Sequence, residues 1–316
     1  MSRHNSYISD SDSTKAFLCK LLVIVGSVIL YLCHIVPQYR DSYSGELAEK
    51  VARLKSIDAP KIVLIGNSNV AFGFDSEYIE SEMGMPVVNM GFHGGVGNKF
   101  HDDMMDYNVT PGDIYVVCHH SYYCNDKIEN PVLAWTAIEN NKDLWHLIKR
   151  EDIPQMIDSF PSYIKKCTNR YNTFEDRRPA DIVYSKSAFN EYGDIYVERE
   201  YTGEDFSEDI WIPVADESET ERLNRWNEYM IERGASLVVS VAPIIYDQWP
   251  ADDNEMNQYQ KELEDALECD VISYWKDYAY DSEMFYNTQY HLNTKGAQLR
   301  SIQLVKDLKE WQKEEQ

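Results

Sequence analysis

The stretch KIVLIGNSN, residues 61–69, decides the fold class of this chain. Its four consecutive apolar residues, 62–65, stand between a lysine and a glycine, which is typical of a short strand buried on both faces. Strands buried in this way belong to parallel sheets, because helices cover both faces of such sheets. Further apolar runs that predict strands follow at residues 87–90, 114–118, 237–245 and 271–274.

Helical patterns separate these strands. Residues 219–233, 255–267 and 294–312 each place apolar side chains on one face, and Gly234 follows the first of these segments as a helix stop. Strands that alternate with helices predict an α/β fold with a parallel sheet, in which ligands bind beyond the carboxyl ends of the strands. Residues 125–219 break the alternation, and we interpret them as an insertion that packs over the sheet.

An apolar segment, residues 16–36, precedes this domain and carries Lys20 as its only formal charge. About 20 apolar residues are enough to cross a bilayer as a helix. A cleaved signal peptide is the alternative, but the residues around Cys33 offer no small-residue cleavage site. We therefore expect a cytoplasmic tail (1–15), a single transmembrane anchor (16–36), a charged linker (37–60) and a folded domain (61–316). Basic residues flank the anchor on both sides, so they do not set its orientation.

The charge of the chain excludes one class of partner. Of its 316 residues, 54 are acidic and 30 are basic, which gives a net charge of −24. A surface this acidic repels phosphate backbones, so no nucleic-acid partner is expected, whereas sugars, acyl groups and basic partners remain open. Four cysteines outside the anchor lack metal-site spacing, and both free thiols and disulfides remain open for them. They are Cys118, Cys124, Cys167 and Cys269.

Residues suited to chemistry follow two strands and precede the last helix. Ser68 follows the first strand, where a nucleophile in an open sheet would lie. The second strand is followed by four glycines within residues 91–97, which allow backbone N–H groups to approach a ligand closely. His291 lies just before the last helix, and Asn293 is the predicted N-cap of that helix.

Taken together, these blocks resemble the SGNH (GDSL-like) hydrolase superfamily, in which a serine after the first strand pairs with a late histidine. Residues 66–69, GNSN, resemble its first block, with Asn67 where aspartate is more usual. Residues 89–91, NMG, resemble the second block and residues 291–293, HLN, the last. The resemblance implies a flavodoxin-like, three-layer SGNH hydrolase fold. Residues 87–95 and 189–194 resemble membrane-anchored bacterial surface-polymer O-acylation proteins of the teichoic-acid D-alanylation D protein type.

The resemblance also implies roles for individual residues. Ser68 would attack an ester carbonyl while His291 takes its proton, and the N–H groups of Ser68 and Gly91 would stabilise the oxyanion. Three further residues are expected to bind substrate, and they are Asn69, His93 and Asn190.

Two departures from the family pattern affect the expected mechanism. The third block usually supplies an asparagine to the oxyanion hole, but strand three ends CHHS and the next asparagine is Asn125. The aspartate expected three or four residues before the histidine is replaced by Thr288 or Asn287. We expect Asn287 to hold the imidazole by a hydrogen bond, with the more distant Asp281 as the alternative.

The resulting hypothesis is a membrane-anchored serine O-acyltransferase or esterase that acts on an extracytoplasmic polysaccharide or acyl ester through an acyl-serine intermediate. The resemblance implies that residues 37–316 lie outside the cytoplasm. It also implies a partner, a polytopic membrane-bound O-acyltransferase, and no cofactor.

Two other functions and one other site are weighed against this hypothesis. The first alternative is an inactive SGNH-like scaffold that binds polysaccharide or the acyltransferase partner. A secreted lipase is the second and requires a cleaved signal peptide. No metal site is expected, because His119 and His120 would point to opposite faces of a strand.

Overall fold

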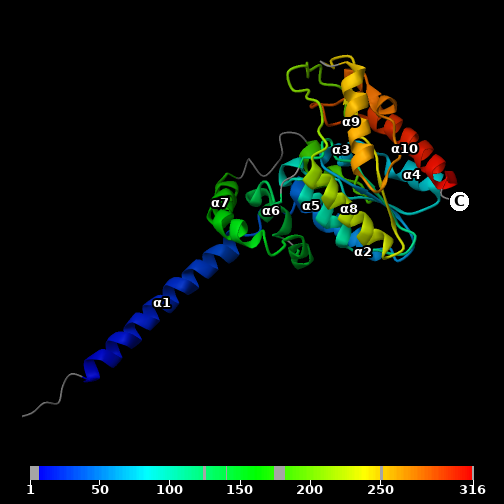
Figure 1. The fold of residues 1–316 in the computed structure, drawn as a ribbon. Helices are drawn as coiled ribbons and strands as arrows, with labels where there is room; N and C mark the ends of the chain where they lie inside the picture. The colour runs from blue at the N-terminus through cyan, green and yellow to red at the C-terminus, as the bar shows by residue number, and fades with distance from the viewer. Residues whose placement is uncertain (1–6, 124–125, 140, 174–181, 250–251, 315–316) are drawn as a thin grey trace, which may run out of the picture.

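The computed structural model describes residues 7–123, 126–139, 141–173, 182–249 and 252–314. It shows a mixed α/β architecture in which a parallel sheet of five strands lies far from one long N-terminal helix, α1 (Figure 1). The predicted parallel sheet is therefore confirmed.

The five strands lie in the order β2-β1-β3-β4-β6, and every neighbouring pair is parallel. Counted within this sheet alone, the order is 2-1-3-4-5, which is found in doubly wound α/β proteins whose ligands bind at the β1/β3 switch point. The strand bounds are β1 (Ile62–Ile65), β2 (Val87–Asn89), β3 (Ile114–Val117), β4 (Ser236–Val239) and β6 (Asp270–Val271).

The fourth predicted strand is too long. The sequence predicts one strand over residues 237–245, but β4 ends at Val239, and β5 (Ile244–Ile245) pairs with β7 (Ala279–Tyr280) in a separate two-stranded sheet. Pro243 lies between the two segments and has no N–H group to donate to a sheet, so it separates two short strands.

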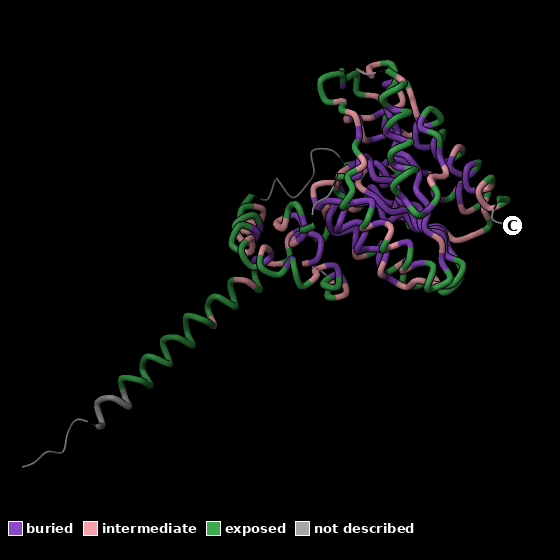
Figure 2. Tube along the Cα trace, in the orientation of Figure 1, coloured by how far each residue is buried: buried purple, intermediate pink, exposed green. Residues whose placement is uncertain are grey.

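Helices cover both faces of the main sheet. Consecutive side chains of β1 point to opposite faces, and all four are buried. Ile62 and Leu64 belong to the core under α4 (Ser76–Met83) and α10 (Thr294–Glu314), and these two helices pack together. Val63 and Ile65 belong to the larger core on the other face. That core is covered by α2 (Leu47–Ser56), α5 (Asn98–Asp103), α8 (Glu217–Ile231) and α9 (Asp253–Ala266), and Figure 2 shows it buried.

The predicted helices are found in the structure, but α8 and α9 each begin two residues before the predicted start, and α8 ends at Ile231 with Glu232 as its C-cap. Asp252 and Glu255 form a capping box at the start of α9. Asn293 accepts a hydrogen bond from the N–H of Gly296 at 2.9 Å, so the predicted N-cap of α10 is confirmed. This cap fixes the loop that carries His291.

Helix α1 (Tyr7–Ile35) contains the segment Ser13–Ile35, which is long and apolar enough to cross a membrane. It is the one helix of this kind within the residues that the structure describes, and of that segment only Ile35, at its end, is buried. The helix begins before the expected start at residue 16, because a helix can continue past the end of its apolar segment. Residues 1–6 of the expected tail lie outside the described residues.

Residues 37–60, predicted to be a charged linker, fold into helical elements. They contain the 3₁₀ helix η1 (Tyr43–Glu46) and helix α2, and Leu47, Val51 and Leu54 of α2 are buried in the larger core. The charged residues between these positions obscure the helical spacing of the buried side chains. The segment is part of the folded unit.

The first part of the predicted insertion, 125–219, lies between α1 and the sheet (Figure 1), whereas its later residues Val183, Ala188 and Phe189 belong to the larger core of the sheet. Its helices α6 (Pro131–Ile138) and α7 (Ile153–Asn172) pack on each other, and α7 also contacts α1. Residues 125, 140 and 174–181 of this segment lie outside the described residues. Cys118, Cys167 and Cys269 are buried free thiols, and Cys124 is not described.

Candidate active site

Ser68 is the first residue of the short helix α3 (Ser68–Ala71), which begins three residues after β1 ends. Asn67 is the N-cap of this helix, and its Oδ1 accepts a hydrogen bond from the N–H of Asn69 at 2.9 Å. The side chain of Ser68 forms no hydrogen bond with any described residue and lines a cavity. Ser68 therefore lies just after the first strand, and its side chain is accessible from a cavity.

The cavity has a volume of about 680 Å³ and lies at the carboxyl ends of β1 and β3. This is the switch point of the sheet, where ligands of doubly wound proteins bind. Its lining brings together residues from distant parts of the chain, which include Tyr43, Asn67, Ser68, His93, Gly94, Gly95, Asn98, His120, Ser121, Tyr123, Tyr184, Trp211, Tyr290 and His291.

His291 lies against the same short helix that carries Ser68. Its ring stacks on the ring of Phe72, the residue that follows α3, with 3.8 Å between centroids and 7° between planes. Burial lowers the pKa of His291 to about 3, and the positive charge of Arg199 acts in the same direction. The imidazole is therefore neutral near pH 7.

Asn287 orients this imidazole. The Oδ1 atom of Asn287 lies 3.0 Å from Nδ1 of His291, and a carbonyl oxygen can only accept a hydrogen bond. Nδ1 consequently carries the proton and Nε2 keeps its lone pair. Tyr184 supports the pair, because its hydroxyl accepts a hydrogen bond from Nδ2 of Asn287 at 2.9 Å and lies 3.3 Å from Nδ1 of His291. Asp281, the alternative, is not a hydrogen-bond partner of His291.

Gly91 does not have the geometry expected of an oxyanion donor. Its N–H donates to Oδ1 of Asn89 at 2.8 Å, and Gly91 is not among the residues that line the cavity. Nδ2 of Asn89 donates to the carbonyl of Val70 and to Asp194. A Cβ atom on Gly91 would lie well inside van der Waals contact with the backbone nitrogen of Ala71. The second sequence block thus holds β2 tightly against α3 and positions Ser68 indirectly.

Of the three residues expected to bind substrate, only His93 lines the cavity. Asn69 is fully buried, where its Nδ2 donates to Oδ1 of Asn67 and to the carbonyl of Cys118. Asn190 lies in a different cavity, and its Oδ1 accepts hydrogen bonds from backbone N–H groups within its own turn. Asn69 and Asn190 are therefore structural in this arrangement.

An aromatic wall formed by His120, Trp211 and Tyr290 lines the cavity, and the sequence did not predict that these residues belong to the site. The His120 ring packs edgewise on Trp211 and Tyr290, with centroids 5.0 Å and 4.5 Å away. Nε1 of Trp211 donates a hydrogen bond to the hydroxyl of Tyr290 at 2.8 Å. Burial lowers the pKa of His120 to about 4, so this ring is neutral as well. High aromatic content was visible in the sequence, but its gathering at one cavity was not.

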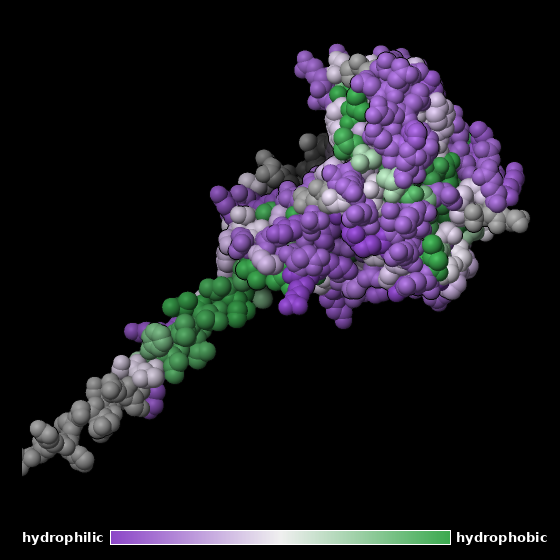
Figure 3. Space-filling model, viewed as in Figure 1, coloured by the Kyte–Doolittle hydropathy of each residue, from purple (hydrophilic) through white to green (hydrophobic). Residues whose placement is uncertain are grey.

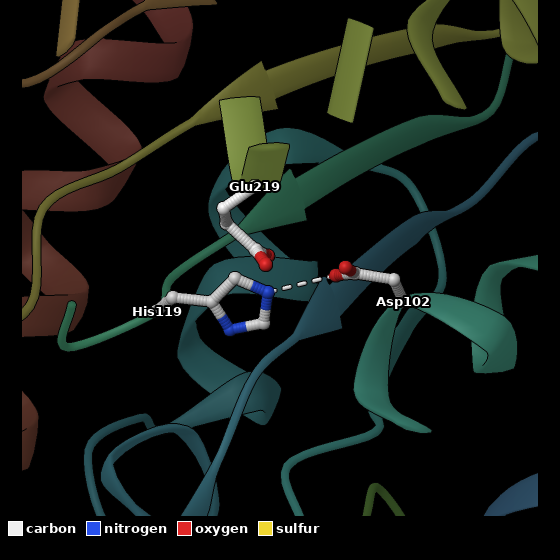
Figure 4. Close-up of side chains that lie close together, drawn as sticks. All are labelled: Asp102, His119 and Glu219. Atoms are coloured by element: carbon white, nitrogen blue, oxygen red, sulfur yellow. Dashed lines mark hydrogen bonds and ion pairs between the residues drawn. The ribbon is translucent and has the colours of Figure 1, made fainter. Parts of the chain in front are cut away.

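His119 points away from the cavity, which confirms that it and His120 face opposite sides. Its Nε2 lies 2.7 Å from Oδ1 of Asp102, and Glu219 completes a buried group whose ligand atoms lie within 4.8 Å of one another (Figure 4). These residue types can hold a metal ion. However, the guanidinium of Arg222 pairs with both carboxylates and supplies positive charge there. We interpret the group as a buried ionic network.

Comparisons of the chain with protein-family models, with curated proteins and with solved structures find no match. The function is therefore inferred from the residues of the cavity and their geometry.

Proposed function

We propose that this protein is a membrane-anchored serine O-acyltransferase or esterase with an SGNH-type, three-layer α/β fold. One observation carries the proposal. Ser68 and His291 line one cavity at the switch point of a parallel sheet, and Asn287 leaves Nε2 of His291 free to accept a proton. A nucleophile and a neutral base in one cavity are what acyl transfer through serine requires.

In the proposed reaction, Oγ of Ser68 attacks the carbonyl carbon of an acyl ester and its proton passes to Nε2 of His291. The tetrahedral intermediate collapses, and the leaving alcohol takes the proton from His291. The acyl-serine is then attacked by a sugar hydroxyl in a transferase or by water in an esterase, and His291 acts as base again. No cofactor takes part in these steps.

Two donors near Ser68 are available for the oxyanion. The N–H of Ser68 opens α3 and has no acceptor within the helix. Nδ2 of Asn67 forms no hydrogen bond with a described residue, and Asn67 lines the cavity. We assign these two groups in place of Gly91, whose N–H is bonded to Asn89, and in place of the family's third-block asparagine.

Among the described residues, no carboxylate forms a hydrogen bond with His291, and this arrangement predicts slow catalysis. Asn287 can hold the ring but cannot neutralise an imidazolium. In a serine protease, replacing the triad aspartate with asparagine lowers turnover about 10⁴-fold, mainly through the wrong tautomer. Here Asn287 presents its oxygen, so the tautomer is the productive one and only the charge is missing.

The proposed acceptor is an extracytoplasmic polysaccharide. The aromatic wall formed by His120, Trp211 and Tyr290 offers apolar faces with polar edges, which suit the C–H faces and hydroxyl edges of sugar rings. A membrane-bound O-acyltransferase that delivers acyl groups is the proposed partner. Digestion of residues 37–316 by protease added to intact spheroplasts would support the orientation, and full protection would contradict it.

A serine-directed fluorophosphonate tests the reaction. The purified full chain in detergent is expected to label, and labelling is expected to disappear in Ser68→Ala. Ser121→Ala is the matched control, because Ser121 also lines the cavity but has no assigned role in the chemistry. That variant should label like the wild type.

The second candidate is a non-catalytic scaffold that binds polysaccharide or the acyltransferase partner. Ser68 forms no hydrogen bond with His291 in this structure, and that observation favours it. A folded wild-type chain that fails to label with the fluorophosphonate, while still binding polysaccharide, would select the scaffold over the enzyme.

A further inference from the structure

Helix α7 carries an apolar stripe that the folded unit leaves exposed. Met156, Tyr163 and Cys167 point into the protein and are buried. Next to them on the helix, Ile153 is 46% exposed and Ile157 is 65% exposed. Large aliphatic side chains with this exposure on one helical face indicate a surface that another apolar phase covers.

The same helix contacts α1 near the end of the apolar segment of α1. The hydroxyl of Tyr31 lies 2.7 Å from Oγ1 of Thr168, and Nε2 of His34 lies 2.7 Å from the hydroxyl of Tyr171. Tyr31 and His34 belong to the last turns of the segment that ends at Ile35. Figure 1 shows α7 beside this end of α1.

These contacts place the C-terminal half of α7 at the end of the apolar segment, where the membrane boundary of an anchored chain would lie. Ile164 packs against the cluster that contains Ile35, and Ile157 lies about 10 Å further along the helix. Thr168 lies four residues after Ile164, which lies seven after Ile157, so all three residues share one face of α7. Lipid that surrounds α1 at Tyr31 would therefore meet this face of α7. In Figure 3 the apolar surface of α1 continues to the base of the folded unit.

The charge of α7 differs in sign from that of the whole chain. The helix contains Lys165, Lys166 and Arg170 against a single acid, Asp158, whereas the chain carries a net charge of −24. Lys166 and Arg170 lie over the ring of Tyr39 on another face of the helix. Lys165 follows Ile164 directly and is the basic residue of α7 that lies nearest the apolar stripe, where it suits an anionic lipid headgroup.

An exposed tryptophan extends the apolar surface beside α7. Trp145 is 50% exposed and packs edgewise on Trp135, whose indole N–H donates to the carbonyl of Met156 in α7. Tryptophan is enriched at membrane interfaces, because its ring is apolar and its N–H is polar.

We propose that α7 is an interfacial helix that lies in the headgroup region of the leaflet facing the folded unit, with Ile153 and Ile157 at the acyl boundary. The occupant of the stripe is a phospholipid surface. The contact would fix the height and tilt of the Ser68 cavity above the membrane. The inference rests on the anchor in the proposed function but not on catalysis.

The test uses the full chain in nanodiscs of mixed phosphatidylglycerol and phosphatidylcholine. A photoreactive benzoylphenylalanine replaces either Ile157 or its exposed neighbour Asp158, and lipid adducts are measured by mass spectrometry. Consecutive residues point about 100° apart on a helix, so roughly tenfold more adduct is expected at position 157 than at position 158. Positions 153 and 162 form a second pair if either first variant fails to fold.

Other outcomes would overturn the inference. Equal lipid adducts at positions 157 and 158 would show that the stripe is not oriented toward lipid. A product of twice the chain mass from position 157 would show that a second copy covers it. A chain that does not enter nanodiscs would contradict the anchor instead, and fluorophosphonate labelling reports separately on catalysis.

Discussion

Oδ1 of Asn287 lies 3.0 Å from Nδ1 of His291, where the triad of a serine hydrolase has a carboxylate oxygen. An amide oxygen selects the tautomer of the ring as a carboxylate does, but it carries no charge. The relationship therefore separates the two roles of the third triad member, orientation and charge stabilisation. The contribution of the charge can therefore be tested by replacing the amide of Asn287 with a carboxylate.

Asn287→Asp is expected to raise the rate of acyl transfer. The new carboxylate would stabilise the imidazolium that forms as Ser68 attacks, and a gain of roughly tenfold corresponds to about 1.4 kcal/mol of transition-state stabilisation. Hydrolysis of a small activated acetate ester by the full chain in detergent measures it. Adding Ser68→Ala should abolish the gain, and a flat or lower rate in Asn287→Asp would contradict the assigned role.

The wild-type rate should not fall as the pH is lowered through 6.5, the ordinary pKa of histidine. The base is active when neutral, and burial lowers the pKa of His291 to about 3, so the ring is neutral at every pH from 5 to 8. In Asn287→Asp the carboxylate favours the imidazolium, and an acidic limb should move up toward neutral pH. Profiles of kcat/KM measure this. A wild-type limb near pH 6.5 would show that the ring is hydrated during turnover.

Gly91→Ala is expected to destabilise the fold because its Cβ would overlap the nitrogen of Ala71, and backbone cannot yield as a side chain does. Overpacking of this kind costs roughly 1–3 kcal/mol. Gly94→Ala is the matched control, since its Cβ would meet Asn67 at 3.5 Å, an ordinary contact. Denaturant unfolding of both variants in detergent measures the difference. Equal stability would show that the approach of β2 to α3 is looser than described.

Glu219→Gln is expected to lower the free energy of unfolding only slightly, whereas Arg222→Leu is expected to lower it strongly. Burial, aided by the charge of Asp102, raises the pKa of Glu219 from 4.5 to about 8, so an amide resembles its protonated form at neutral pH. Removing Arg222 leaves the buried carboxylate of Asp102 without its guanidinium partner, which costs about 3–5 kcal/mol. Unfolding free energies of the two variants measure the contrast, and similar losses would contradict it.

The protonation of Glu219 can also be tested, by comparing how the stability of the wild type and of Glu219→Gln depends on pH. The folded chain keeps the proton of Glu219 up to a pH of about 8, whereas the unfolded chain loses it near 4.5. The folded state thus binds more protons in this window, and its stability falls as pH rises. Wild type should lose stability relative to Glu219→Gln between pH 5 and 8. A constant difference across that range would show that Glu219 is ionised in the folded state.

Much of the sheet was predictable because a strand that is buried on both faces shows a run of consecutive apolar residues. Residues 62–65 gave β1 with its bounds, and the runs at 87–90 and 114–118 gave β2 and β3 to within one residue. The prediction failed where local pattern and tertiary pairing differ. Residues 244–245 look like a continuation of β4, yet they pair with β7 because Pro243 interrupts the ladder.

The charged segment 37–60 shows a second limit. Its helix α2 contributes Leu47, Val51 and Leu54 to the core, but neighbouring charges masked this spacing. Lys50 of the same helix is buried and donates hydrogen bonds to the carbonyls of Asn89 and Gly193. Its position depends on acceptors that are distant in sequence.

Local sequence was enough to specify an apolar N-terminal helix, a parallel sheet, a serine after the first strand and a histidine next to the cap of the last helix. These features depend on residues within a few positions of one another. The folded arrangement was needed to establish that Asn287 and Tyr184 hold His291, that the N–H of Gly91 is bonded to Asn89, and that α7 lies beside α1. Each of these depends on side-chain directions and on contacts between separate elements, which the spacing of residues along the chain does not specify.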